Sequence, residues 1–158
     1  MRILKIIAAI LALALPIILV AAPIGPLPGV WIGGADTPTP SVWQDTSAVD
    51  EIRLKAPGTI PRVVIIWVVD FEGELYVLGM KNSGWTGMIG EGGPVEFRIG
   101  DETYSVRATP VVERAEEVYT AYLAKYEPNY PELVASFPSI EEGRETAVIF
   151  KLDRGTSR

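Results

Sequence analysis

The stretch from Arg62 to Arg107 constrains the fold most, because it consists almost entirely of short apolar runs separated by turn residues. Val, Ile, Tyr and Phe dominate the runs, and Gly, Asp, Asn and Pro lie between them, which is the pattern of antiparallel hairpins. Gly100-Asp101 supplies the positive φ that a tight two-residue turn requires. The stretch predicts a four-strand antiparallel meander with one polar, glycine-bearing loop at 81–87; the strands are 62–69, 74–80, 95–99 and 102–108.

The remainder of this region predicts helices and a closing strand. Apolar residues at 115, 118, 119, 122, 123 and 126 have the spacing of an amphipathic helix, which we expect over 113–126. A second short helix is expected from Tyr130 to Phe137, with Pro131 in its first turn. After a loop at 138–143, residues 145–152 read as a final strand. Residues 41–52 are compatible with a further short helix that leads into the sheet.

The N-terminus has a different character from the rest of the chain. Arg2 and Lys5 precede an uncharged apolar run of seventeen residues, 6–22, interrupted only by Pro16. Such a length lies between a signal-peptide core and a membrane span of about 20 residues. Because Pro23 would hinder a peptidase acting after Ala22, we favour an uncleaved transmembrane anchor over a cleaved signal.

Basic residues ahead of the apolar run place the N-terminus in the cytoplasm. The sequence therefore predicts a single-pass protein of the bacterial inner membrane, with its folded domain in the periplasm. We divide the chain into an anchor (1–24), a Pro/Gly-rich linker (25–44), a barrel domain (45–153) and a tail (154–158). Trp31 is either an aromatic residue at the membrane surface or a tryptophan packed on the domain, and both readings stay open.

Histidine and cysteine are both absent, which removes many kinds of active site. Ser-His-Asp and Cys-His mechanisms, HExxH zinc sites and haem with a His ligand are excluded. No acidic cluster has the spacing of a hard-cation site, so we expect no metal. The net charge of −6 disfavours nucleic-acid binding. Any chemistry would come from a bound cofactor.

The order of these segments resembles that of split β-barrel proteins of the pyridoxamine-phosphate-oxidase and deazaflavin-dependent nitroreductase type. The loop Lys81-Asn82-Ser83-Gly84-Trp85 and the hairpin at 94–108 match the corresponding parts of these proteins, and the likeness covers about residues 50–153. It implies a mainly β (α+β) fold: an antiparallel split β-barrel with one or two packing helices, to which this sequence adds an N-terminal transmembrane helix.

The resemblance also implies a cofactor site. In such barrels, basic side chains and hydroxyls hold the flavin phosphate at the ends of the core strands. Carried over, this nominates Arg62, Lys81, Ser83 and Trp85, with FMN or a deazaflavin as the cofactor, and Lys55 as a weaker nominee. A tryptophan can wall an isoalloxazine ring or pack beneath it.

Each nominee also has a purely structural reading. Arg62 can be a solvated strand-end residue, Trp85 a plug at the barrel end, and Lys81 and Ser83 turn residues. The sequence departs from the resembled pattern after the tryptophan, where Glu91 introduces a charge that would oppose a phosphate.

Two functions are compatible with these observations. The first is a membrane-anchored accessory or structural subunit of a larger membrane complex, or a homo-oligomer, that faces the periplasm and has lost most cofactor contacts. The second is a flavin- or deazaflavin-dependent oxidoreductase that acts on a quinone-like or other small substrate. Whether the chain is an enzyme stays open, and no catalytic residue is nominated.

Overall fold

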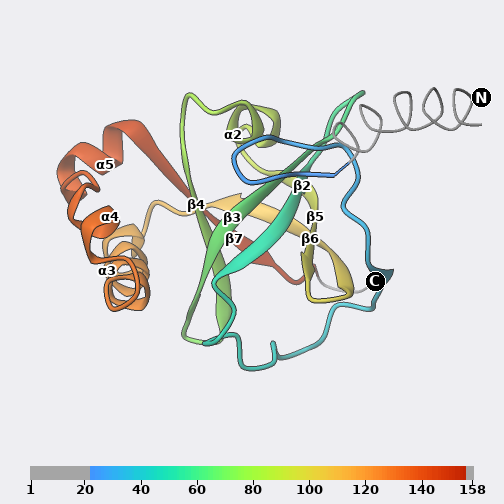
Figure 1. Cartoon of the computed structure of the whole chain (residues 1–158), viewed down its shortest axis with the longest axis horizontal. Helices are drawn as coiled ribbons and strands as arrows, with labels where there is room; N and C mark the ends of the chain where they lie inside the picture. The colour runs from blue at the N-terminus through green and yellow to red at the C-terminus, as the bar shows by residue number, and fades with distance from the viewer. Residues whose placement is uncertain (1–21, 156–158) are drawn as a thin grey trace, which may run out of the picture.

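The centre of the structure, a computed structural model that describes residues 22–155, is a closed antiparallel barrel (Figure 1). The strands of this part pair in the order β6-β5-β2-β3-β4-β7, and β7 pairs back with β6, which closes the sheet. The predicted split-barrel fold is confirmed. The barrel strands are β2 (Glu51–Ala56), β3 (Arg62–Phe71), β4 (Glu74–Met80), β5 (Gly93–Ile99), β6 (Glu102–Pro110) and β7 (Ala147–Asp153); the short β1 (Ala35–Asp36) runs parallel to β6.

The strands exist where the sequence predicts them, but they do not form a simple meander. β4 pairs with β7, with Leu78 opposite Ile149, and β5 pairs with β2, with Leu54 opposite Phe97. α2 (Gly84–Ile89) connects β4 to β5 across one end of the barrel, as Figure 1 shows. Strand propensity does not specify the partner, which is chosen by the burial of one face of each strand.

Alternating residues of the strands fill the barrel. Leu54, Val77, Phe97 and Leu152 are fully buried inside it. Trp43, from the irregular segment before β2, packs edge-on against Phe97 with the ring centroids 5.3 Å apart. The helix expected at 41–52 is therefore wrong: residues 41–50 are irregular, with Trp43 buried in the core, and β2 already begins at Glu51.

A second, smaller core lies between the barrel and the helices α3 (Ala115–Tyr126), α4 (Pro131–Ala135) and α5 (Ile140–Thr146), which gather on one side of the barrel (Figure 1). Trp67 of β3 stacks on Tyr126 of α3, with ring centroids 4.0 Å apart. The helices predicted at 113–126 and 130–137 are confirmed. The expected loop at 138–143 instead contains the start of α5, because Ser139 and Glu142 form a capping box.

Residues 25–44, expected to be a linker, contain β1 as their only helix or strand but are fastened to the barrel. Gly29 exchanges two backbone hydrogen bonds with Val63, of 2.8 and 2.7 Å. The Thr103 hydroxyl donates to the Gly33 carbonyl at 2.7 Å.

The transmembrane helix predicted over 1–24 falls mainly on residues 1–21, which lie outside the described residues, as do residues 156–158 of the tail. Between residues 22 and 155, no helix combines the length and the apolar character that crossing a bilayer requires.

Candidate cofactor site around helix α2

The turn from β4 into α2 is held by hydroxyl groups. The Ser83 hydroxyl donates to the Met80 carbonyl at 2.9 Å, and the Thr86 Oγ1 lies 2.8 Å from the same carbonyl oxygen. Ser83 occupies the N-cap of α2 but accepts no hydrogen bond from the helix backbone. The Ser83 hydroxyl therefore donates its proton within the turn, and its oxygen does not cap the first backbone amides of α2.

Trp85 turns away from the surface into the barrel. It is 7% exposed and contacts Phe150, with ring centroids 5.9 Å apart. Its indole lies against Gly79 of β4 so closely that a Cβ at that position would collide with the ring. The structure places Trp85 as a plug of the barrel end, on the buried side of α2.

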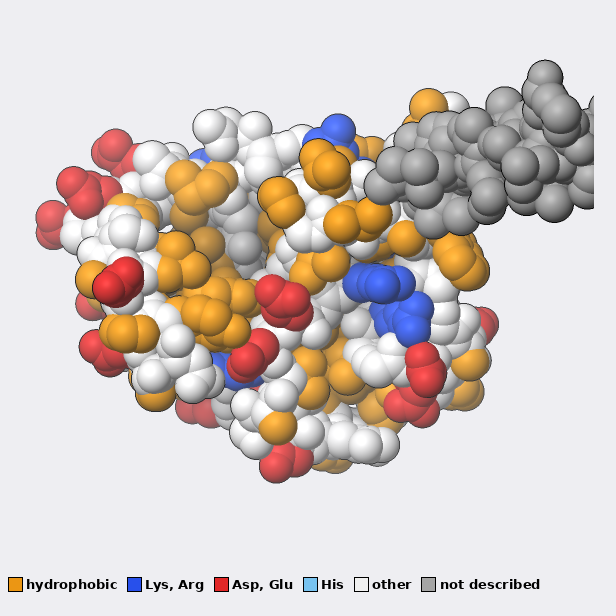
Figure 2. Space-filling view, viewed as in Figure 1, with side chains coloured by type: hydrophobic (Ala, Val, Ile, Leu, Met, Phe, Trp, Pro, Cys, Tyr) orange, Lys and Arg blue, Asp and Glu red, His pale blue; other side chains and the backbone are white. Residues whose placement is uncertain are grey.

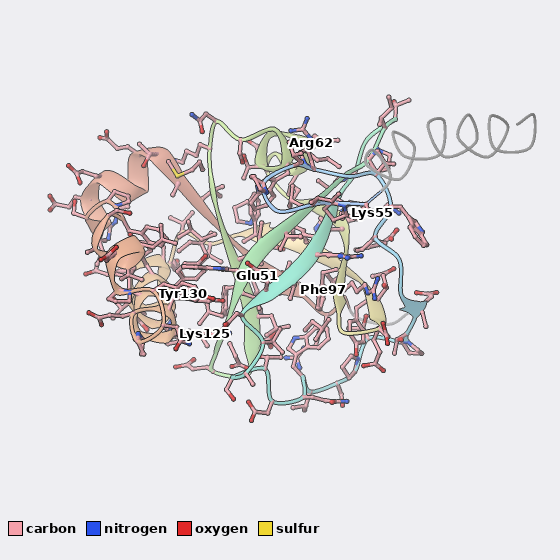
Figure 3. All side chains as sticks on the ribbon, viewed as in Figure 1. Glu51, Lys55, Arg62, Phe97, Lys125 and Tyr130 are labelled. Atoms are coloured by element: carbon pink, nitrogen blue, oxygen red, sulfur yellow. The ribbon has the colours of Figure 1, made fainter. Side chains whose placement is uncertain are left out.

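Arg62 lies at the opposite, exposed side of the same helix. Its guanidinium rests against Gly84, the first residue of α2, where a Cβ would collide with Nη1 and lie 2.9 Å from Cζ. Figure 3 shows Arg62 beside α2. Among residues 22–155, no carboxylate forms an ion pair with Arg62.

The first amides of α2 are also available in this part of the structure. The first backbone hydrogen bond of the helix runs from the Gly87 N–H to the Ser83 carbonyl, so the amides of residues 84–86 precede the hydrogen-bonded turn. A guanidinium beside uncapped amides is an arrangement that binds an anion such as phosphate.

One face of α2 carries no side chains. Gly84, Gly87 and Gly90 are three residues apart, and a Cβ at Gly87 would meet nothing within 4 Å. A hollow of about 470 Å³ borders this face, lined by Lys81, Thr86, Gly87, Gly90, Glu91, Pro110, Val148 and Phe150. The glycine face, defined by these three glycines, is therefore covered by Arg62 at Gly84 and borders open space at Gly87 and Gly90.

Lys81 stands between this hollow and a second one. Its ammonium donates to the Arg144 carbonyl at 2.7 Å, near the end of α5, where a cation is favoured. It also lines a mostly apolar cavity of about 360 Å³ between the barrel and the outer helices. The apolar lining of that cavity comes from Leu78, Pro110, Val111, Val112, Ala115, Tyr119, Ile140, Ala147, Val148 and Ile149, with Lys81, Glu116 and Arg144 as its charged residues.

The nominated residues thus separate into three positions. Arg62 and Ser83 both lie at the first turn of α2, Lys81 lies between the two hollows, and Trp85 is inside the barrel. Lys55 is engaged elsewhere, in an ion pair with Glu96 at 2.9 Å. The roles of these residues in cofactor binding stay predictions.

Sequence reasoning missed the glycine face. The signal was present as glycines spaced three residues apart, at 84, 87 and 90. Reading residues 81–87 as a loop concealed it, because the spacing has a meaning only on a helix.

Neither a protein-family model nor a curated protein sequence matches the chain. Solved structures do match it. The FAD and haem binding protein from Mycobacterium smegmatis is 15% identical, with a TM-score of 0.51 over 69% of this chain and 62% of that one. A NimC/NimA family protein from Clostridium acetobutylicum is 18% identical, with a TM-score of 0.47 over 65% of this chain and 73% of that one.

At 15% identity the likeness to the mycobacterial protein shows the fold alone, which is the split β-barrel that the sequence predicted. The chain spans 62% of the length of the mycobacterial protein. FAD and haem are the cofactors of that protein.

Proposed function

We propose that this chain is a membrane-anchored flavin-binding protein that holds the cofactor along α2. The observation that carries the proposal is the Arg62 guanidinium beside the uncapped amides of residues 84–86. The fold likeness to a protein that binds FAD supports it. Of the two cofactors of that protein, haem with a His or Cys ligand does not fit, because the chain has neither residue.

The chemistry of the site fits the two ends of a flavin. A phosphate would accept hydrogen bonds from Arg62 and from the amides at the start of α2. The planar ring would lie on the part of the glycine face formed by Gly87 and Gly90, which borders the hollow. Glu91 lines the same hollow and would repel a phosphate there, which favours the phosphate at the Arg62 end.

A flavin or deazaflavin, when bound, supplies hydride or electron transfer, and the residues of this site bind and orient it. The apolar cavity of about 360 Å³ shares Lys81, Pro110 and Val148 with the hollow beside the glycine face. Its apolar lining suits a quinone-like or similar small substrate. The proposed activity is therefore oxidoreduction between the cofactor and an apolar acceptor.

The test is a flavin titration of the full-length protein in mild detergent. A charge-assisted hydrogen bond contributes about 1.5–3 kcal/mol, so Arg62→Gln should weaken flavin binding by roughly ten- to a hundredfold. Arg114→Gln is the matched control, because Arg114 is an exposed arginine that pairs with Glu72 near α3. A chain that takes up no flavin, or an Arg62→Gln variant with unchanged affinity, would contradict the proposal.

A second candidate function is an accessory subunit of a membrane complex, or a homo-oligomer, without a cofactor. This function is favoured because three of the residues nominated for the cofactor are engaged within the protein. Ser83 and Lys81 donate to backbone carbonyls, and Trp85 is buried. Co-purification from the membrane in mild detergent tests it. A partner that is retained in fixed proportion would support it, and a chain that is always recovered as a lone monomer would count against it.

The membrane anchor and the periplasmic location are part of both candidates and rest on the sequence. Sequencing of the mature N-terminus distinguishes an uncleaved anchor from a cleaved signal. Accessibility of the domain to protease added to intact spheroplasts tests the location, and a domain that is protected until the membrane is opened would place it in the cytoplasm.

A further inference from the structure

An exposed apolar segment lies at the beginning of the described chain. Trp31 is 66% exposed and Leu27 is 63% exposed, and Ile24 and Val30 are also exposed. The segment is fixed rather than free, since Ile24 and Leu27 exchange two backbone hydrogen bonds of 3.0 Å and Gly29 is bonded to Val63. A fastened segment that presents four large apolar side chains to solvent is characteristic of a contact surface.

Two arginines lie directly beside this segment. Arg53 of β2 and Arg98 of β5 are opposite one another in the sheet, an arrangement in which like charges repel. Both guanidinium groups lie on the carbonyl oxygen of Ile32, the residue after Trp31, at 3.4 and 3.3 Å. Figure 2 shows blue side chains next to orange ones on the right of this face.

The local carboxylates do not neutralise this pair completely. Arg98 also pairs with Asp101 at 2.8 Å, and the neighbouring Lys55 is matched by Glu96. Within residues 22–155, the Ile32 carbonyl is the only hydrogen-bond acceptor of the Arg53 side chain. The Arg53 guanidinium therefore leaves a local positive charge on a chain whose net charge is −6, and this charge lies beside exposed apolar side chains.

The position of this face along the chain identifies its partner. The uncharged apolar run 6–22 ends two residues before Ile24. If that run spans a bilayer, the attachment of Gly29 to Val63 leaves no free linker, so the face lies at the membrane surface. Phosphate headgroups match the arginines, and the boundary between headgroups and acyl chains matches Trp31 and Leu27.

We infer that the segment Ile24–Trp31 and the pair Arg53 and Arg98 form a docking face for an anionic lipid surface. The face holds the barrel against the membrane from which it emerges. This inference rests on the anchor of the proposed function, but not on flavin binding, because Arg62 and the glycine face are not part of it. The anchor attaches the chain to the bilayer, and the docking face fixes the orientation of the barrel on it.

The experiment uses the full chain in vesicles of phosphatidylcholine, with or without phosphatidylglycerol, whose acyl chains are brominated near the headgroup. Bromine quenches tryptophan by contact, and Trp31 is the most exposed of the four tryptophans. We expect quenching in phosphatidylglycerol vesicles, weaker quenching in phosphatidylcholine alone, and its loss in Trp31→Phe. Each arginine near an anionic surface contributes about a fivefold change in partitioning, so Arg53→Gln with Arg98→Gln should lower the docked-to-undocked ratio by roughly 25-fold.

Arg114→Gln, on the side of α3, is the control and should leave quenching unchanged. If wild-type chains float with the vesicles but brominated anionic lipid does not quench their Trp31 fluorescence, the docking face is overturned and the anchor is left intact. Wild-type chains that do not float with vesicles would overturn both the anchor and the docking face. Retained flavin absorbance in the Arg53→Gln, Arg98→Gln chain separates docking from the cofactor site.

Discussion

The Arg62 guanidinium at the start of β3 lies against Gly84 at the start of α2. A Cβ on residue 84 would collide with Nη1 and lie 2.9 Å from Cζ. The cation therefore reaches the uncapped end of the helix because residue 84 has no side chain. The identity of one glycine decides where the candidate phosphate ligand can lie.

Gly84→Ala should displace Arg62 and weaken flavin binding by about tenfold, the value of one moderately strong hydrogen bond to a charged group. The Arg62 side chain is flexible, so the collision can be relieved at little cost to folding. Alanine also favours the helix by up to about 1 kcal/mol over glycine. Flavin titration and urea unfolding of the same variant measure the two effects separately.

Gly155→Ala is the matched control, because a Cβ there meets nothing within 4 Å and the residue lies in the tail. It should leave both the affinity and the free energy of unfolding unchanged. Wild-type affinity in Gly84→Ala would show that Arg62 does not need its observed position to hold the phosphate.

Gly79→Ala tests the position of Trp85 as a plug of the barrel. A Cβ at residue 79 would collide with the indole and lie 2.6 Å from the Thr86 Cγ2. Because overpacking of a dense core costs about 1–3 kcal/mol, the free energy of unfolding should fall by that amount in urea titration. An unchanged free energy of unfolding would mean that the indole can leave the core, and Trp85 would again be available to wall a flavin ring.

Much of the fold follows from local patterns in the sequence. The apolar runs at 62–69 and 102–108 and the helical spacing at 113–126 lie in the elements that the structure contains. Such periodicities record which face of an element is buried. The capping box of Ser139 and Glu142 is also a local sequence signal. A serine followed by a glutamate three residues later is sufficient to predict the start of α5.

The arrangement of the candidate site depends on long-range geometry that a periodicity does not record. Lys81, Ser83 and Trp85 are close in sequence, but α2 directs the tryptophan inward while Lys81 reaches α5. Arg53 and Arg98 become neighbours only because β2 pairs with β5, a consequence of barrel closure. Composition and spacing nominate residue types, and the strand pairing decides which of them meet.

Tyr126→Phe should destabilise the junction of α3 with the barrel. The buried Tyr126 hydroxyl accepts from the Val68 amide at 2.9 Å and lies 2.6 Å from the carbonyl oxygens of Val68 and Asp50. The Val68 carbonyl also accepts from the Lys125 ammonium at 2.8 Å, and the Val68 amide also donates to the Asp50 carbonyl at 3.3 Å. The loss of the hydroxyl should therefore cost about 1 kcal/mol, the net value of a typical hydrogen bond. Urea unfolding should show this loss in the free energy of unfolding.

Tyr130→Phe is the matched control, because Tyr130 is 38% exposed and surface changes of this kind alter stability by about 0.5 kcal/mol at most. Equal stability of the wild type and Tyr126→Phe would mean that water replaces the hydroxyl at the junction.

The stability of the fold should fall at alkaline pH because buried tyrosines resist ionisation. Burial, reinforced by the hydrogen bond to Glu102, raises the pKa of Tyr104 to about 12, and burial also raises the pKa of Tyr122 and Tyr126. The folded chain then holds the Tyr104 proton more tightly than the unfolded chain, whose tyrosines ionise near pH 10. The contribution is fully present below about pH 10 and is lost as the pH rises to about 12.

Urea unfolding at steps of pH should therefore show a falling free energy of unfolding above about pH 10. Tyr104→Phe removes one of the groups responsible, so its decline should be shallower than that of the wild type over the same interval. Tyrosinate absorbance of the folded protein provides an independent readout, since the Tyr104 hydroxyl should ionise late. Parallel declines of the two proteins would show that Tyr104 ionises in the folded state as readily as in the unfolded chain, and that its hydrogen bond to Glu102 does not hold the proton.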